Sequence, residues 1–159
     1  MKTLYILLLV LISYTNCFSQ VDKKFDKIVT QEISLNNGTS LKLSDFKGKV
    51  VLLDFWYRGC YPCLKATPDL INLQEEFKKN LVIIGINDRD DAQDITDYYL
   101  YKNANYLSTY KTDLNISKTL SISTFPTFII IDKKGNIVYN EIGFDKKEIR
   151  KQIKKITKN

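Results

Sequence analysis

Two cysteines separated by two residues are the side chains best suited to carry chemistry in this sequence. Cys60 and Cys63 enclose Tyr61 and Pro62, and they follow the apolar segment 49–56. We expect Cys60 to lie at the start of a helix, where unbonded backbone N–H groups and the helix dipole favour a thiolate. Cys63, one turn further on, would be close enough to attack a mixed disulfide on Cys60. The spacing therefore predicts a reactive dithiol.

Two other interpretations of the cysteine pair compete with this one. A zinc site would need further ligands, but the only other cysteine is Cys17 and the sequence contains no histidine. A purely structural disulfide across a four-residue loop would stabilise the fold by only about 2 kcal/mol. The absence of histidine also excludes His-assisted hydrolases and imidazole base catalysis. We therefore expect thiol chemistry that needs no metal and no cofactor.

The N-terminus has the pattern of a secretory signal peptide. A basic residue precedes the apolar run 4–12, and polar residues follow it. Nine apolar residues are too few to cross a bilayer, which needs about 20, but they fit the core of a signal peptide. We expect cleavage between Ser19 and Gln20, which would remove Cys17 and leave one cysteine pair. Cleavage before Cys17 with attachment of a lipid is the alternative, although residues 14–16 match a lipoprotein signal poorly.

The sequence predicts a signal peptide over residues 1–19 and one domain over residues 20–159, because no repeat or linker interrupts the latter. Near-continuous apolar runs at 49–56 and 81–87 predict parallel strands that are buried on both faces. Alternation of strands and helices, ending in a hairpin and a helix, indicates an α/β fold with a mixed sheet. Helices are predicted at 62–79, 91–101, 113–120 and from Asp145 onward, and further short strands at 28–33, 41–46, 127–132 and 136–142.

The segment LKLSDFKGKVVLLDFW (residues 41–56), followed by the cysteine pair, closely resembles the thioredoxin superfamily. Within that superfamily, the chain is similar to the extracytoplasmic thiol-disulfide oxidoreductases of the TlpA/ResA type. Residues 125–127 (FPT) resemble the loop that bears the family's cis-proline, and residues 132–138 resemble its hairpin. The resemblance runs from about residue 28 to the final helix. It implies a thioredoxin-like fold, in which helices flank a central mixed sheet, with a short N-terminal strand extension.

The resemblance implies a role for each matching residue. Cys60 would be the attacking thiolate and Cys63 the resolving thiol. Asp54 matches the buried acid that helps to deprotonate the resolving cysteine, since a buried carboxyl with a raised pKa can accept a proton near neutral pH. Pro126 would face the disulfide in cis and leave backbone groups available to an extended substrate. The alternatives are a strand-end Asp54 bonded to nearby backbone and an ordinary trans proline at position 126.

Several residues around the motif depart from the family pattern. Gly59 stands where relatives usually have Trp, and Tyr57 and Arg58 replace small residues. Arg58 either lowers the pKa of the Cys60 thiol by its charge or is a solvated cation. Tyr61 is either part of an aromatic substrate surface or a shield over the sulfur, and Phe125 is bulky enough to narrow the range of substrates. We expect substrate contacts from four residues: Trp56, Tyr61, Phe125 and Pro126.

The predicted function is exchange of disulfides with protein substrates in an extracytoplasmic compartment, most simply a periplasm. We expect a reductant, because Pro62 directly precedes the second cysteine as in thioredoxin. The resemblance implies disulfide-bearing secreted proteins or apocytochromes as substrates and a membrane thiol protein as electron donor. We also expect a monomer that does not bind nucleic acid, since no nucleic-acid motif accompanies the net charge of +6.

Two other functions remain open at the level of sequence. Residues 41–56 also resemble peroxiredoxins, which would make the protein a thiol peroxidase. Those proteins, however, carry Thr or Ser where Tyr57 stands. The departures at Gly59, Tyr61 and Phe125 suggest instead a binding or chaperone module whose disulfide is structural.

Overall fold

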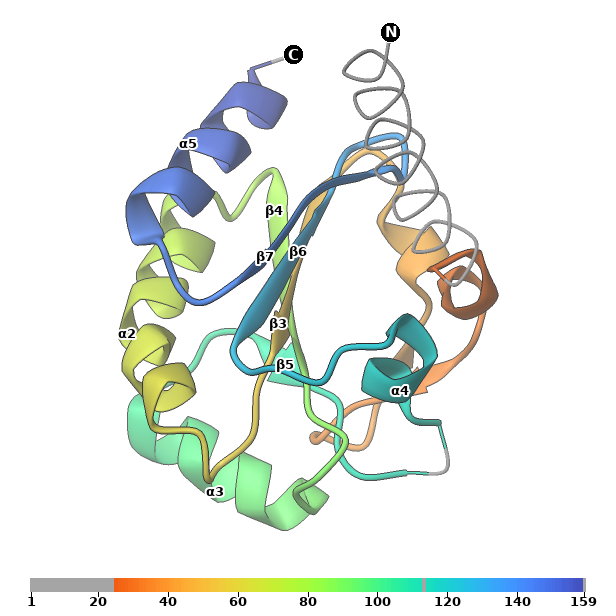
Figure 1. Cartoon of the computed structure of the whole chain (residues 1–159), viewed down its shortest axis with the longest axis vertical. Coiled ribbons are helices and arrows are strands. Elements are labelled where there is room, and N and C mark those ends of the chain that lie inside the picture. Colours follow the sequence, from red (N-terminus) through yellow and green to blue (C-terminus); the bar gives the residue numbers. More distant parts are fainter. Residues whose placement is uncertain (1–24, 113, 159) are drawn as a thin grey trace, which may run out of the picture.

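A five-stranded mixed sheet with the order β5-β4-β3-β6-β7 lies at the centre of the computed structural model, which describes residues 25–112 and 114–158 (Figure 1). Its strands are β3 (Val50–Phe55), β4 (Leu81–Ile86), β5 (Leu107–Ser108), β6 (Thr127–Ile131) and β7 (Ile137–Ile142). β3, β4 and β5 are parallel, whereas β6 is antiparallel to β3 and β7 is antiparallel to β6. The predicted signal peptide, its cleavage site and Cys17 lie outside the described residues.

The central position of β3 follows from its composition, because all six of its residues are apolar or buried. Alternate side chains point to opposite faces of the sheet. Leu52 packs into a first core cluster and Leu53 into a second one on the other face. The predicted parallel pairing of the two apolar runs is confirmed, with Leu52 opposite Ile83 in the register.

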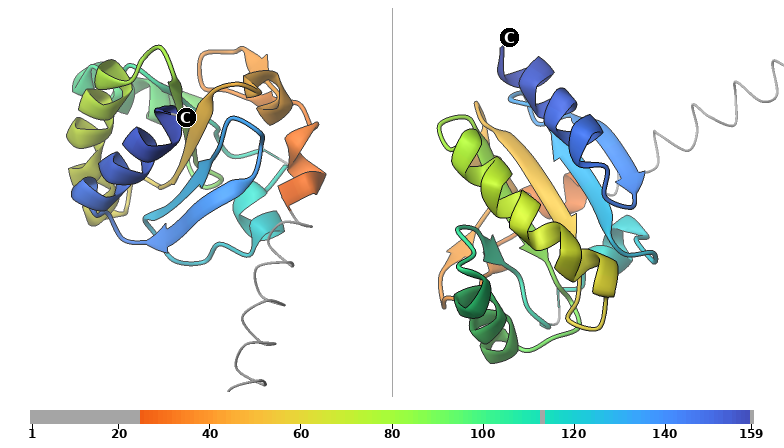
Figure 2. Two further views of the ribbon diagram at one scale, coloured as in Figure 1. Left: turned by 90° about the horizontal axis from the view of Figure 1, so that it is seen from above. Right: turned by 90° about the vertical axis from the view of Figure 1, so that its left-hand side faces the viewer.

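Helices cover both faces of the sheet (Figure 2). The first cluster lies beneath α2 (Tyr61–Glu76), α3 (Ala92–Lys102) and α5 (Lys146–Thr157). The second cluster is covered by the short α4 (Ile116–Leu120) and by the helical residues 25–29. This three-layer arrangement confirms the predicted thioredoxin-like α/β fold.

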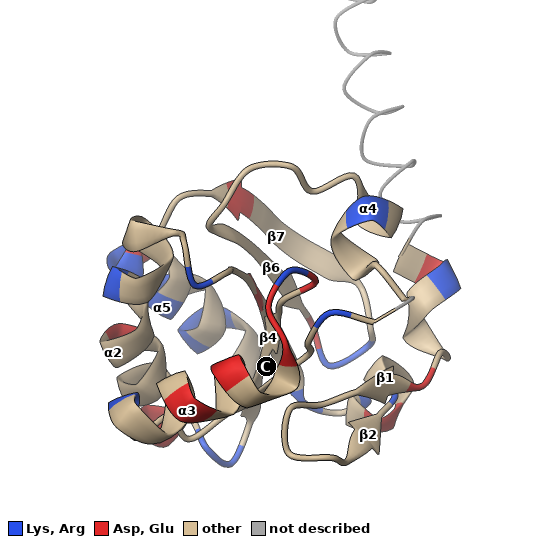
Figure 3. Ribbon diagram, turned by 90° about the horizontal axis from the view of Figure 1, so that it is seen from below, with Lys and Arg blue, Asp and Glu red and all other residues tan. Residues whose placement is uncertain are grey.

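The C-terminal helix α5 shows how the basic charge is placed. Asp145 is its N-cap and accepts hydrogen bonds from the backbone N–H groups of Lys147 and Glu148, each at 3.0 Å. Ile149 and Ile153 are fully buried, whereas the basic residues of the helix, coloured blue in Figure 3, are exposed. Two of these cations pair with α2, Lys146 with Asp69 and Arg150 with Glu76.

The N-terminal extension is partly different from the prediction. A two-stranded hairpin is present, but its strands β1 (Ile33–Ser34) and β2 (Ser40–Leu41) are shorter than expected, and residues 25–29 are helical. Residues 43–46 form the 3-10 helix η1 (Leu43–Phe46) instead of continuing the strand, because the Asp45 carboxylate accepts a hydrogen bond from the Lys42 N–H at 3.1 Å and closes a turn. The hairpin is a separate two-stranded sheet that contacts the segment of β5, where the Asn36 N–H donates to the Ser108 carbonyl.

Candidate active site

The two cysteines form a disulfide at the point where β3 passes into α2. Cys60 is the N-cap of α2, and its Sγ accepts a hydrogen bond from the Cys63 N–H at 3.3 Å. Pro62 lies in the first helical turn, where its missing N–H is not needed. The dipole and unbonded N–H groups of this 16-residue helix favour negative charge on Cys60 Sγ once the disulfide is reduced. The predicted place of Cys60 at a helix N-terminus is confirmed.

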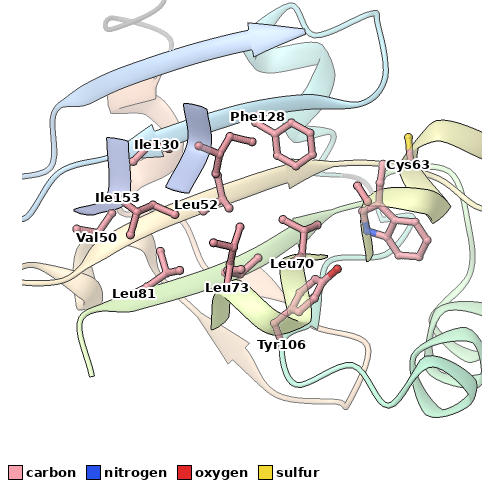
Figure 4. Packing of buried hydrophobic residues seen from close by; sticks show 14 of the residues in the cluster. Val50, Leu52, Cys63, Leu70, Leu73, Leu81, Tyr106, Phe128, Ile130 and Ile153 are labelled. Atoms are coloured by element: carbon pink, nitrogen blue, oxygen red, sulfur yellow. The ribbon is translucent and has the colours of Figure 1, made fainter. Parts of the chain in front are cut away.

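Both cysteines belong to the same buried apolar cluster, but only Cys60 is the N-cap of α2. Cys63 is 2% exposed, and Figure 4 shows it at one end of an apolar cluster that also contains Leu70 and Phe128. A thiolate is disfavoured among apolar side chains, so Cys63 needs a nearby base before it can attack.

Asp54 is the buried acid of this region. It is 3% exposed, and its Oδ1 atom has no hydrogen-bond partner in the described part of the chain. Its side chain shares a sheet face with those of Leu52 and Trp56, which pack in the same cluster as Cys63. Burial raises the pKa of Asp54 from 3.8 to about 8. A carboxyl with these properties could take a proton from Cys63 near neutral pH, and this role stays a prediction.

The loop before β6 contains the predicted proline, and the Phe125–Pro126 peptide bond is cis. The Pro126 carbonyl accepts a hydrogen bond from the Gly143 N–H at 2.9 Å, and the Thr124 carbonyl accepts one from Thr127 Oγ1. The N–H and carbonyl of Phe125, by contrast, have no hydrogen-bond partner among residues 25–112 and 114–158. The backbone of Phe125 is thus available to an extended substrate.

Tyr57, Arg89 and Phe125 form a compact group that we call the guanidinium–aromatic cluster. The rings of Tyr57 and Phe125 meet edge to face, with their centroids 5.4 Å apart. The guanidinium carbon of Arg89 lies 4.3 Å from the centroid of Tyr57 and 4.5 Å from that of Phe125. Each residue comes from a different loop, one after β3, one after β4 and one before β6, so the cluster connects the cysteine motif to the proline loop.

Sequence reasoning did not single out Arg89, although a signal for it was present. The residue follows the predicted strand at 81–87, and β4 is parallel to β3. The C-terminal ends of neighbouring parallel strands lie at one edge of a sheet, where ligand sites commonly form. Arg89 therefore had to lie near the cysteine motif that follows β3.

The absence of a side chain at Gly59 is explained by the position of Tyr57. A Cβ atom at Gly59 would lie 2.8 Å from Cε2 of the Tyr57 ring, which is closer than such contacts allow. To relieve this contact, the ring would have to shift against Phe125 and Arg89. The departure from the family's usual Trp is thus coupled to the presence of Tyr57.

The remaining predicted site residues occupy different environments. Tyr61 is 67% exposed beside Cys60, and Lys65 Nζ lies 4.7 Å from the centroid of its ring. Its exposure fits a substrate surface. Trp56 is 2% exposed and lies beneath the motif, where its Nε1 donates to Ser108 Oγ at 3.0 Å. This burial does not favour the predicted direct contact of Trp56 with substrate and gives the residue a supporting position instead.

Arg58 pairs with Asp94 of α3, so a carboxylate balances its positive charge. Both side chains are about half exposed, which favours the interpretation of Arg58 as a solvated cation.

In the described ranges, no group of three or more His, Cys, Asp or Glu side chains lies close enough together to hold a metal ion. None of the helices formed by these same residues is sufficiently long and apolar to cross a membrane.

Comparison with known proteins places this geometry among thiol oxidoreductases. The family model described as Redoxin matches residues 20–157. The chain is 32% identical to the thiol-disulfide oxidoreductase ResA of Bacillus anthracis, over 87% of this chain and 79% of the relative.

Two solved structures give the same result at the level of the fold. The thioredoxin domain of a thiol-disulfide oxidoreductase from Bacteroides vulgatus has a TM-score of 0.68 and 28% identity, over 77% of this chain and 92% of that one. The exposed lipoprotein thioredoxin Etrx1 of Streptococcus pneumoniae has a TM-score of 0.69 and 26% identity, over 79% of this chain and 98% of that one.

Proposed function

Because the chain belongs to the Redoxin family and is a thiol-disulfide oxidoreductase of the thioredoxin type, similar to ResA, we propose that it acts as a reductant of protein disulfides. The observation that carries this proposal is the Cys60–Cys63 disulfide at the N-terminus of α2. The cis-proline loop and the buried Asp54 support it further. The relatives are oxidoreductases by name, which favours exchange over a peroxidase or a purely structural module.

The proposed reaction moves two electrons from the reduced protein to the substrate. The Cys60 thiolate attacks one sulfur of a substrate disulfide, and the other substrate sulfur leaves as a thiolate that takes a proton from solvent. Cys63 then gives its proton to Asp54 and attacks Cys60 Sγ, which releases the second substrate thiolate. The products are a reduced substrate and the Cys60–Cys63 disulfide. Asp54 afterwards passes its proton to solvent.

The substrate is proposed to bind as an extended segment beside the cis-proline loop. The unpaired backbone N–H and carbonyl of Phe125 would form strand-like hydrogen bonds with it. The exposed Tyr61 and the partly buried Phe125 would supply apolar contact on either side of Cys60. These contacts depend little on substrate sequence, because backbone groups make the hydrogen bonds.

We propose an extracytoplasmic location, with disulfide-bearing secreted proteins or apocytochromes as substrates. The N-terminal sequence pattern supports this location. The structural similarity to a pneumococcal protein described as an exposed lipoprotein supports it as well. A membrane thiol protein is the proposed donor that returns the Cys60–Cys63 pair to its dithiol form, and the protein is proposed to act as a monomer in a periplasm.

Reduction of insulin disulfides tests the proposed activity. The reduced wild-type protein should accelerate the reaction, Cys60→Ser should abolish the acceleration, and Cys63→Ser should accumulate a mixed disulfide. Equal rates for the wild type and Cys60→Ser would overturn the proposal. The reduction potential of the Cys60–Cys63 pair tests whether the protein acts as a reductant or as an oxidant. We expect a value closer to that of thioredoxin, about −270 mV, than to that of the strong oxidant DsbA, about −120 mV.

A further inference from the structure

We propose that Arg89 is a specificity-determining residue, which selects substrate segments that carry a carboxylate beside the reactive disulfide. This inference rests on the proposed exchange activity and adds a substrate class to it. It starts from the guanidinium–aromatic cluster, which places one cation at the junction of the cysteine motif and the proline loop.

The geometry leaves the positive charge of Arg89 available to a bound carboxylate. Its guanidinium carbon lies within 4.5 Å of the centroids of both rings, and because the rings stand at 86° to each other, at most one of them can stack on the flat face of the guanidinium. The N–H groups at the edges of the plane can still donate to a carboxylate. Within the described residues, the Arg89 side chain forms neither an ion pair nor a hydrogen bond, and only its backbone N–H has a partner, Asn87 Oδ1.

Carboxylates close to Arg89 in the sequence are already bonded elsewhere. Asp88 accepts from the Ser117 N–H at 2.8 Å and from the Ile116 N–H at 3.4 Å. Asp90 accepts from the Arg58 N–H and from Asn87 Nδ2, each at 2.7 Å. The loop after β4 thus holds Asp88 and Asp90 in place while Arg89 remains unpaired.

A hollow beside the cluster gives a bound segment a place to lie. It has a volume of about 490 Å³, and its lining includes Arg89, Phe125, Ser117, Lys118 and Ser123. Ser117 is only 7% exposed, and its Oγ has no hydrogen-bond partner in the part of the chain that the structure describes. Because this Oγ atom has almost no exposed surface, it does not itself identify a ligand, and the polar character of the hollow rests on Arg89, Lys118 and Ser123.

The charges around the hollow identify the kind of ligand. Lys118, the charged residue of α4, adds a second cation to its lining, and Figure 3 shows α4 on the same side of the molecule as the charged loop after β4. Asp88 also lines the hollow and keeps its negative charge, but its carboxylate already accepts from the Ile116 and Ser117 N–H groups, so two cations, Arg89 and Lys118, face one carboxylate. An Asp or Glu side chain near the substrate cysteine would therefore complement the site.

Phe125 connects this preference to the reaction. Its backbone is proposed to pair with the substrate, and its ring is in contact with Arg89. A segment that pairs with Phe125 therefore passes Arg89 within a residue or two of the reactive sulfur. The proposed occupant of the hollow is therefore the acidic segment that flanks the reactive cysteine of the protein substrate.

Matched peptide disulfides test the inference. Three synthetic peptides would differ only at the residue next to cysteine, which is Glu, Ala or Lys, and each would be presented as its symmetrical disulfide. We expect the reduced wild-type protein to reduce the Glu peptide about fivefold faster than the Lys peptide at low salt. Arg89→Gln should bring this ratio close to one, and Arg89→Glu should reverse the preference.

A control variant separates Arg89 from the general basic charge of the protein. Lys134→Gln removes one cation from the exposed turn between β6 and β7, and the ratio should stay at its wild-type value. Equal rates for the Glu and Lys peptides with the wild-type protein, or an unchanged ratio in Arg89→Gln, would overturn the inference. Failure of the wild type to reduce any of the three peptides would count against the proposed exchange activity instead.

Discussion

Asp54 of β3 and Gly85 of β4 lie directly opposite each other in the parallel register of the sheet. Gly85 has no room for a side chain, because a Cβ atom would lie 2.6 Å from the Tyr99 hydroxyl, 2.7 Å from Ser108 Oγ and 2.8 Å from Trp56 Nε1. These tightly packed groups close the sheet face beside Asp54 to solvent. The environment that raises the pKa of the carboxyl is therefore built by the neighbouring strand as well as by the helices above.

The stability of the oxidised protein should decrease as the pH rises from about 4 to about 8. Folded Asp54 keeps its proton up to a pKa of about 8, whereas the unfolded chain releases it near 3.8. Between these values the folded state binds more protons than the unfolded state, so a higher pH favours unfolding, by up to about 1.4 kcal/mol per pH unit. Above about pH 8 this contribution is constant. Urea denaturation at several pH values measures the slope.

The control for this experiment is Asp54→Asn, which keeps the size and polarity of the side chain but cannot ionise. The difference in unfolding free energy between the variant and the wild type should grow with pH up to about 8. A difference that is the same at about pH 5 and about pH 8 would show that Asp54 has no raised pKa.

Asp54→Asn should also slow the release of the mixed disulfide by about 100-fold, since a positioned base typically contributes a factor of this order or more. The wild-type release rate should rise with pH and level off near the Asp54 pKa of about 8. The first attack by Cys60 does not use this carboxyl and should keep its rate. Rapid mixing followed by acid quenching separates the two steps, and an unchanged release rate in the variant would exclude Asp54 as the base.

Gly85→Ala should destabilise the protein by about 1 to 3 kcal/mol, because the added methyl group overlaps three buried polar atoms. Chemical denaturation of the oxidised protein gives the loss directly. The double variant Gly85→Ala/Tyr99→Phe removes the hydroxyl that lies nearest to the new Cβ, so Gly85→Ala should cost less in the Tyr99→Phe background. Equal costs in the two backgrounds would mean that the hydroxyl is not the source of the strain.

Asp145→Ala should lower the unfolding free energy by about 1 kcal/mol, since two N–H groups at the start of α5 lose their acceptor. Asp145→Asn retains an acceptor oxygen and should recover most of the loss. If both variants are equally destabilised, the side chain does not act as a helix cap.

The strands and helices that could be predicted from sequence are those whose local hydrophobic pattern matches their burial in the folded protein. The apolar runs of β3 and β4 leave no polar face, so they could only be buried strands. The two residues of β5 were missed because their pairing arises from contact with β4 and the N-terminal hairpin, not from local pattern. η1 was missed because the turn-forming bond to Asp45 competes with strand formation.

The same distinction separates the features of the candidate site that could be predicted from sequence from those that could not. The helix start at Cys60 could be expected from the cysteine motif, and the cis bond before Pro126 from the resemblance of residues 125–127 to the cis-proline loop of the thioredoxin superfamily. The contact of Arg89 with Phe125 depends on how two distant loops meet, and the burial of Trp56 depends on the packing of α3 against β3. Neither the Arg89–Phe125 contact nor the burial of Trp56 can be read from the spacing of nearby residues in the sequence.

The close approach of Gly59 to the Tyr57 ring has a consequence for how this site could have diverged from that of other thioredoxin-like proteins. A larger residue at position 59 requires that the Tyr57 ring shift or that residue 57 become smaller, and without the Tyr57 ring Arg89 keeps contact with Phe125 alone. The positions are linked, so a change at one of them disturbs the contacts of the others. Among relatives they should be inherited as a set, with Tyr57, Gly59 and Arg89 present together or lost together.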